Sequence, residues 1–146
     1  MSVSLDALAR EASPDAVALA VAVLEGDFAD RVWREQVGAS LSQRDTARLL
    51  GRSEQAVSKD RRLLRVSRRD GRPVYPVFQF EGRRQRPGVA DVVSVLEDSV
   101  NALTTASWLT APNDTLGGSR PIDALTEGRL EEVLSLAARM AERMKH

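Results

Sequence analysis

The segment from Leu41 to Arg62 constrains the fold more than any other part of this chain. It reads LSQRDTARLLGRSEQAVSKDRR. The Ser42 hydroxyl is placed to cap one short helix, and Ser53 is placed to cap a second helix. Between them, Gly51 can adopt the positive φ that a sharp turn requires. The segment therefore predicts two short helices joined by a tight glycine turn.

The spacing of the apolar residues in this segment predicts how the two helices meet. Ala47 is small enough for the second helix to cross close to the first, and Val57 is the apolar anchor of the second helix. This spacing is that of a DNA-binding helix-turn-helix. The alternative is an amphipathic helical hairpin whose basic face is only solvated. The residues predicted to contact bases and phosphates from the outward face of the second helix are Ser53, Glu54, Gln55, Ser58, Lys59 and Arg62.

Two charged residues depart from the usual helix-turn-helix pattern. Arg52 and Asp60 stand where such units often carry apolar side chains. We therefore expect the packing at the end of the second helix to depend on Leu63 and Leu64.

The distribution of charge also points to a polyanionic partner for the middle of the chain. The 146 residues carry a net charge of zero, yet residues 41–90 contain 13 Lys and Arg against 5 Asp and Glu, a local charge of 13 − 5 = +8. The flanks together therefore carry −8. A basic centre between acidic flanks favours nucleic-acid binding by the centre and protein contacts by the flanks.

A β-hairpin is predicted directly after the two helices. Residues 64–68 and 74–80 alternate between apolar and polar side chains, and residues 69–72 form a turn signal between them. Pro73 and Pro76 are expected to make the second strand an edge strand or to leave it partly paired. Three arginines of this hairpin are predicted to contact the DNA backbone or a minor groove: Arg68, Arg69 and Arg72. The alternative is a solvated loop.

The first 40 residues are expected to serve packing or dimerisation. Residues 4–11 have helical spacing, and the helix predicted from Pro14 to Glu25 is apolar on nearly all sides, so either the fold or a second copy must cover it. Trp33 is interpreted as a core residue. Because one recognition helix covers only a few base pairs, we expect a homodimer on DNA.

The chain from residue 87 onward is predicted to be helical. Pro87-Gly88 separates the basic region from an apolar stripe that runs from Val89 to Leu103, and residues 129–144 form an amphipathic helix. The fold class is therefore mainly α. We expect N-terminal helices in residues 1–40, a helix-turn-helix region with a short hairpin in residues 41–86, and a small α-helical domain in residues 87–146.

Several blocks of the sequence resemble the Xre/MbcA/ParS type of bacterial antitoxin, whose partner toxins carry a RES domain. The blocks are Trp108-Leu109, Pro112-Asn113, Leu116-Gly117-Gly118, Pro121-Ile122, Leu125-Thr126-Glu127-Gly128, and the segment from Val74 to Phe80. The resemblance implies an antitoxin that occludes the NAD-binding active site of a cognate RES-domain toxin and represses its own operon. The residues placed where such a toxin would meet the chain are Asn113, Gly117, Gly118, Arg120, Arg139, Arg143, Lys145 and His146.

Enzymatic chemistry is not expected. The sequence has no cysteine, its one histidine is His146, and it contains no phosphate-loop motif and no metal-ligand spacing, so we expect no catalytic residue, cofactor or metal. No apolar run is long enough to span a bilayer, and the composition suits a cytoplasmic protein. The rival interpretation is a stand-alone helix-turn-helix repressor whose C-terminal part dimerises or senses a ligand.

Overall fold

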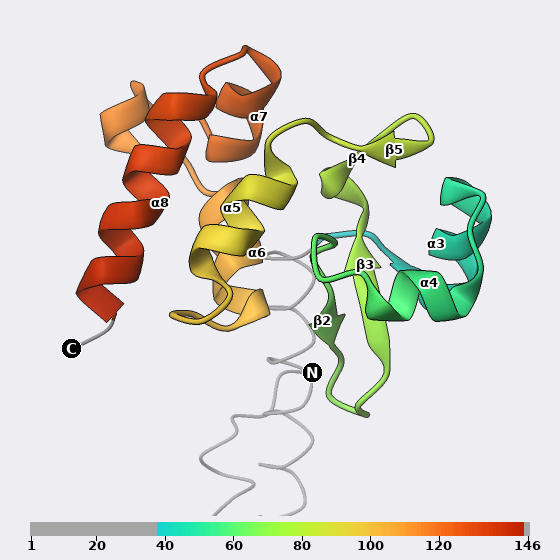
Figure 1. The fold of residues 1–146 in the computed structure, drawn as a ribbon. Helices are drawn as coiled ribbons and strands as arrows, with labels where there is room; N and C mark the ends of the chain where they lie inside the picture. The colour runs from blue at the N-terminus through green and yellow to red at the C-terminus, as the bar shows by residue number, and fades with distance from the viewer. Residues whose placement is uncertain (1–37, 145–146) are drawn as a thin grey trace, which may run out of the picture. The chain divides into compact units, whose positions relative to one another are not determined.

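The computed structural model describes residues 38–144 (Figure 1). The chain divides into two compact units, Met1–Glu35 and Gln36–His146, and all described residues belong to the second. The helices predicted in the first 40 residues, together with Trp33, lie outside the described residues. Lys145 and His146 lie outside them as well.

Two short helices form where the sequence predicts them. Helix α3 spans Gln43–Leu50 and helix α4 spans Glu54–Lys59. The Ser42 hydroxyl caps α3 by accepting from a first-turn amide at 3.1 Å, and the Ser53 hydroxyl caps α4 in the same way at 3.1 Å. Gly51 ends α3 in the left-handed region at φ 65°, as the turn requires.

The α3–α4 pair covers a small apolar cluster. Its buried members are Ala47, Val57, Leu63, Tyr75 and Phe80. Val57 is 1% exposed, so it anchors α4 as expected. Leu63 and Leu64 are also buried, which confirms that the chain leaving α4 relies on them for packing.

The chain beside these helices forms a three-stranded antiparallel sheet. Strands β1 (Ser40–Ser42), β2 (Val66–Ser67) and β3 (Pro73–Pro76) are arranged in the order β1-β3-β2. The predicted hairpin is the β2–β3 pair, in which Val66 lies opposite Val74. Strand β1, which directly precedes α3, joins the other side of β3.

We expected the two prolines to make β3 an edge strand or to leave it partly paired. The first alternative is wrong, because β3 is the central strand. The second holds on one side, because β2 pairs only with Pro73 and Val74 of β3. Pro73 and Pro76 occupy its first and last positions, so the missing N–H groups fall at the strand ends. Val74 lies between them and has a partner on each side, Ser42 and Val66. A central strand thus tolerates prolines that bracket it.

The alternating pattern of residues 74–80 also overestimates the length of this strand. After Pro76 the chain makes a 3-10 turn, Val77–Gln79, and then forms a second hairpin. That hairpin pairs β4 (Phe80–Glu81) with β5 (Arg84–Gln85) and was not predicted. The side chain of Gln79, which the alternation places on a strand, is instead fully buried beneath the exit from α4.

Residues 89–144 form four α-helices and a 3-10 turn. These elements are α5 (Val89–Leu96), α6 (Ala102–Thr110), the 3-10 turn η2 (Asp114–Leu116), α7 (Pro121–Thr126) and α8 (Leu130–Met144). The predicted apolar stripe is divided between α5 and α6, because Asn101 caps α6 through a 2.8 Å hydrogen bond. Helix α8 packs along α5 (Figure 1).

The apolar face of α8 is buried along most of its length. Val133 and Ala137 are fully buried and Ala141 is 6% exposed, whereas Met144 is 55% exposed because the helix ends there. No helix among residues 38–144 has the length and apolar character needed to cross a membrane.

At Gly88 the chain passes close to the last two helices. Its φ is +91°, and a Cβ at this residue would lie 2.8 Å from Leu125 Cδ2 and 3.0 Å from Leu130 Cδ1. The glycine is therefore required both by its conformation and by the space available.

Candidate nucleic-acid interface

Helix α4 presents most of the predicted base-reading residues to solvent. Glu54, Gln55 and Lys59 are exposed. Ser53 is exposed too, but its hydroxyl is engaged in capping the helix. Ser58 is only half-buried, and its carbonyl accepts from Arg65 Nη1 at 3.1 Å. The outward face of α4 thus offers one amide, one ammonium and one carboxylate.

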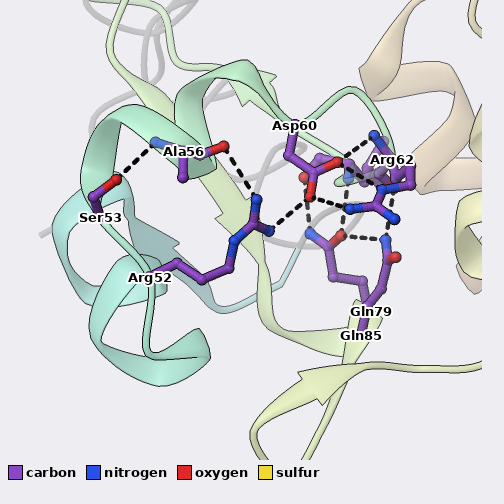
Figure 2. Close-up of polar contacts among 8 residues, drawn as sticks. Arg52, Ser53, Ala56, Asp60, Arg62, Gln79 and Gln85 are labelled. Atoms are coloured by element: carbon purple, nitrogen blue, oxygen red, sulfur yellow. Dashed lines mark hydrogen bonds and ion pairs between the residues drawn. The ribbon is translucent and has the colours of Figure 1, made fainter.

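An ion-pair cluster joins the two ends of α4 (Figure 2). Arg52, in the turn before the helix, donates from Nη1 to Asp60 Oδ2 at 2.7 Å, and from Nη2 to the Ala56 carbonyl at 3.4 Å. Arg62, after the helix, donates to the same carboxylate from Nε at 3.1 Å and from Nη2 at 3.2 Å. Arg52 and Asp60, which break the usual apolar pattern, therefore pair with each other.

The Asp60 carboxylate is strongly stabilised in its charged form. Burial alone raises its pKa, but hydrogen bonds from Arg62 and Arg52 outweigh that effect and lower the pKa from 3.8 to about 2. The carboxylate side chain is 6% exposed, whereas the side chain of Arg62 is 73% exposed. The acid is covered by the arginines that it holds.

Two glutamines fix the main chain that leaves α4. Gln79 donates from Nε2 to the Leu64 carbonyl and accepts through Oε1 from the Leu64 amide, each at 2.8 Å. Gln85, on β5, donates from Nε2 to the Arg62 carbonyl at 2.8 Å. Figure 2 shows both glutamines beside Arg62. The second, unpredicted hairpin therefore supports the end of α4.

The turn between β2 and β3 carries the three predicted backbone-contacting arginines. Arg68, Arg69 and Arg72 are all exposed. The turn is closed by hydrogen bonds from the Arg68 amide to the Arg72 carbonyl and from the Gly71 amide to the Arg68 carbonyl, each at 2.8 Å. Asp70 accepts from the Arg72 amide and guanidinium, both at 2.9 Å, and these bonds lower the pKa of its carboxyl.

Further cations lie on other elements of the unit. The side chains without an ion-pair partner in residues 38–144 include Arg44 and Arg48 on α3, Lys59 on α4, Arg68 and Arg69 in the turn, and Arg83 and Arg84 in the second hairpin. Arg86 is different, because it donates to the Phe78 carbonyl at 2.9 Å and to the Thr126 hydroxyl at 2.8 Å. The positive charge counted in the sequence is thus mostly available on the surface.

The predicted toxin-facing residues fall in two places. Asn113 caps the 3-10 turn by accepting from Thr115 N at 3.0 Å, and Gly117 and Gly118 are exposed with positive φ. Arg120 is held by Asp123, with Nε donating at 2.7 Å. The second place is α8, where Arg139 and Arg143 are exposed.

Arg139 lines a cavity on α8. The cavity has a volume of about 340 Å³ and is lined by Thr115, Leu116, Glu131, Glu132, Ser135, Leu136 and Arg139. It lies between the 3-10 turn and α8. The two groups of predicted residues thus approach each other at this cavity without forming one compact site.

Asp60 and the two glutamines are the residues that sequence reasoning missed. Asp60 is an isolated acid in the run Lys59-Asp60-Arg61-Arg62, and Arg52 precedes it by eight residues. An acid inside a basic run is a usable signal for an ion-pair cluster. Gln79 gives no such signal, because its partner is a main-chain segment 15 residues away.

Comparison with known proteins gives a family match in the C-terminal part of the chain. Residues 87–141 match the family model described as "Rv2175c C-terminal domain of unknown function". The chain is also similar to the solved "NMR structure of Rv2175c", with 25% identity and a TM-score of 0.59, over 70% of this chain and 81% of that one. A comparison with curated proteins found no match.

Proposed function

We propose that this chain is a DNA-binding protein in which α3 and α4 act as a helix-turn-helix. In this proposal α4 enters the major groove, and the turn between β2 and β3 contacts the backbone or a minor groove. The observation that supports it best is the combination of a short capped helix with exposed Gln55 and Lys59 and a neighbouring turn with exposed Arg68 and Arg69. An amide and a cation suit base edges, and arginines suit phosphates.

The arrangement of the strands supports the same proposal. Strand β1 enters α3 directly, and β2 and β3 follow α4, so one sheet carries both the helix pair and the arginine turn. A small sheet of this kind holds two contacting elements in a fixed relation, which is what readout of two adjacent grooves requires.

A test of this proposal begins with selection of duplexes from a random pool by the full chain. Fluorescence anisotropy then compares the parent with Lys59→Ala and with Arg143→Ala, a matched loss of one exposed cation on α8. We expect the Lys59 variant to bind the selected duplex less tightly by about 1 to 3 kcal/mol, with the α8 variant unchanged. If no duplex is enriched and binding does not depend on salt, the proposal is wrong.

We further propose that the chain binds its operator as a homodimer. One α4 reads only a few base pairs, so two copies spaced by about one turn of DNA are expected on a two-fold symmetric site. The helix predicted from Pro14 to Glu25 stays the candidate interface. Light scattering of the full chain, alone and with the selected duplex, measures this, and one chain per duplex would contradict it.

The second proposal, that residues 87–146 neutralise a RES-domain toxin, rests on the sequence resemblance. Its structural support is the cavity lined by Arg139 beside the 3-10 turn that Asn113 caps. A double variant, Arg139→Ala with Arg143→Ala, should lose protection of cells that express the cognate toxin, while DNA binding is retained. If the variant protects as well as the parent, α8 is not the neutralising element. If the parent itself does not protect, the stand-alone repressor is the better description.

A further inference from the structure

Asp60 is an unexpected residue on a surface proposed to meet DNA. It lies in a run of exposed basic residues, Lys59, Arg61 and Arg62, and it carries the charge that a phosphate repels. Its side chain is 6% exposed, and both of its oxygen atoms accept hydrogen bonds. A negative charge at this place weakens binding to DNA. We therefore expect a specific role for the Asp60 carboxylate.

The contacts of Asp60 span the whole of α4. Oδ2 accepts from Arg52, in the turn before the helix, at 2.7 Å. Oδ1 accepts from both the amide and the Nε of Arg62, after the helix, at 3.0 and 3.1 Å. Charge-assisted bonds from two atoms of one guanidinium fix its plane as well as its position. One carboxylate thus determines where both arginines lie relative to α4.

Arg62 is fixed by its main chain as well as by its side chain. Its amide donates to Asp60 and its carbonyl accepts from Gln85 Nε2 at 2.8 Å. Yet 73% of its side chain is exposed, and the guanidinium keeps N–H groups that Asp60 does not use. Because the side chain of Arg62 is already held in one position, it loses less rotamer entropy when it binds a partner than a free arginine would.

We propose that Asp60 is a positioning residue that orients Arg62, and with it Arg52, for sequence discrimination by α4. This inference rests on the proposed DNA-binding function. The negative charge of Asp60 weakens the general attraction of this surface to phosphates, because it offsets one of the two arginine charges. The same carboxylate holds the guanidinium of Arg62 in one orientation. Only a duplex with a hydrogen-bond acceptor in that direction then gains the contact.

The test compares the parent with Asp60→Asn, which keeps the shape of the side chain and removes its charge. Anisotropy gives the dissociation constants for the selected duplex and for an unrelated duplex of equal length, between about 50 and 200 mM salt. We expect the ratio of the two constants to fall about tenfold, since one oriented base contact is lost. Binding to the unrelated duplex should strengthen and become steeper in salt by about one unit of logarithmic slope, since one more arginine can reach a phosphate.

Two further variants separate positioning from charge and from support of the fold. Asp98→Asn makes the same charge change at an exposed acid between α5 and α6, so it should leave the ratio unchanged. Adding Asp60→Asn to Arg62→Ala should lower the ratio much less than Asp60→Asn does in the parent, because only Arg52 is then left for Asp60 to orient. A purely structural Asp60 would instead weaken binding to both duplexes by the same factor.

Asp60→Glu covers the case in which Asp60→Asn does not fold. It keeps the charge and moves the carboxylate outward by one methylene, so we expect a lower ratio with the same salt slope. An unchanged ratio in whichever variant folds overturns the positioning role. Absence of any salt-dependent DNA binding by the parent overturns the proposed function together with this inference, whereas a parent that binds and variants that keep its ratio overturn the inference alone.

Discussion

Asp60 Oδ2 lies 2.7 Å from Arg52 Nη1, so the residue that ends α4 is bonded to the turn that begins it. Such a pair ties a helix of only six residues, Glu54–Lys59, into the rest of the unit. Short helices have little stability of their own, so α4 depends on contacts such as this ion pair, which joins its two ends. The pair is largely shielded from water on its acidic side, because the Asp60 side chain is 6% exposed.

The first prediction concerns the pH dependence of stability. The pKa of Asp60 is lowered from 3.8 to about 2 in the folded chain, so its contribution is complete above the unfolded pKa and is lost as the pH falls toward 2. We expect Asp60→Asn to cost about 2 kcal/mol of unfolding free energy at about pH 5, with the cost shrinking as the pH approaches 2. Urea denaturation of both chains over this range measures it. A difference that stays constant with pH would contradict the assignment.

The second prediction concerns Gln79, which is fully buried. Its amide satisfies both the N–H and the carbonyl of Leu64. Gln79→Leu should cost about 1 to 3 kcal/mol for each main-chain group that it leaves unpaired. Gln55→Leu is the matched control on the exposed face of α4, and it should change stability by less than about 0.5 kcal/mol. Equal stability of the two variants would show that the Gln79 bonds are replaced by other partners.

The third prediction concerns two glycines with positive φ but different surroundings. Gly51→Ala, where a Cβ meets nothing within 4 Å, should cost only the left-handed conformation, about 1 to 2 kcal/mol. Gly88→Ala adds a contact of 2.8 Å with Leu125 Cδ2, so it should cost about 2 to 4 kcal/mol. Thermal unfolding of the two variants compares them directly. If Gly88→Ala lowers the stability no more than Gly51→Ala does, Leu125 moves aside freely and the contact does not matter.

The fourth prediction separates general from sequence-specific binding to DNA. Arg69→Ala, in the exposed turn between β2 and β3, should weaken binding to every duplex similarly and lower the logarithmic salt slope by about one unit. Gln55→Ala should instead weaken binding mainly to the selected duplex. Salt titrations with selected and unrelated duplexes distinguish the two patterns. The reverse assignment would place base readout in the turn rather than on α4.

The helices with capping residues were predictable from the sequence, because their signals are local. Ser42, Gly51, Ser53 and Pro121 mark helix ends within a few residues of where the structure has them. The β2–β3 hairpin was predictable for the same reason, since its turn is encoded by adjacent residues.

Relations between distant residues were not predictable. The central place of β3 depends on pairing with β1, which precedes it by more than 30 residues in the chain. The alternation of residues 74–80 did not reveal that Gln79 turns inward to bind Leu64, because a polar side chain at a strand position is equally compatible with solvent. The Arg52–Asp60 pair was likewise not predictable, because an acid inside a basic run signals an ion pair without showing which arginine it binds.

The most direct measurement of the central claim is a two-dimensional NMR titration of the full chain with the selected duplex. We expect the largest amide shift changes in residues 53–62 and 68–72, and residues 130–144 of α8 should remain nearly unchanged. If the largest changes fall in residues 113–144 while α4 and the β2–β3 turn do not respond, α4 is not the DNA-reading helix.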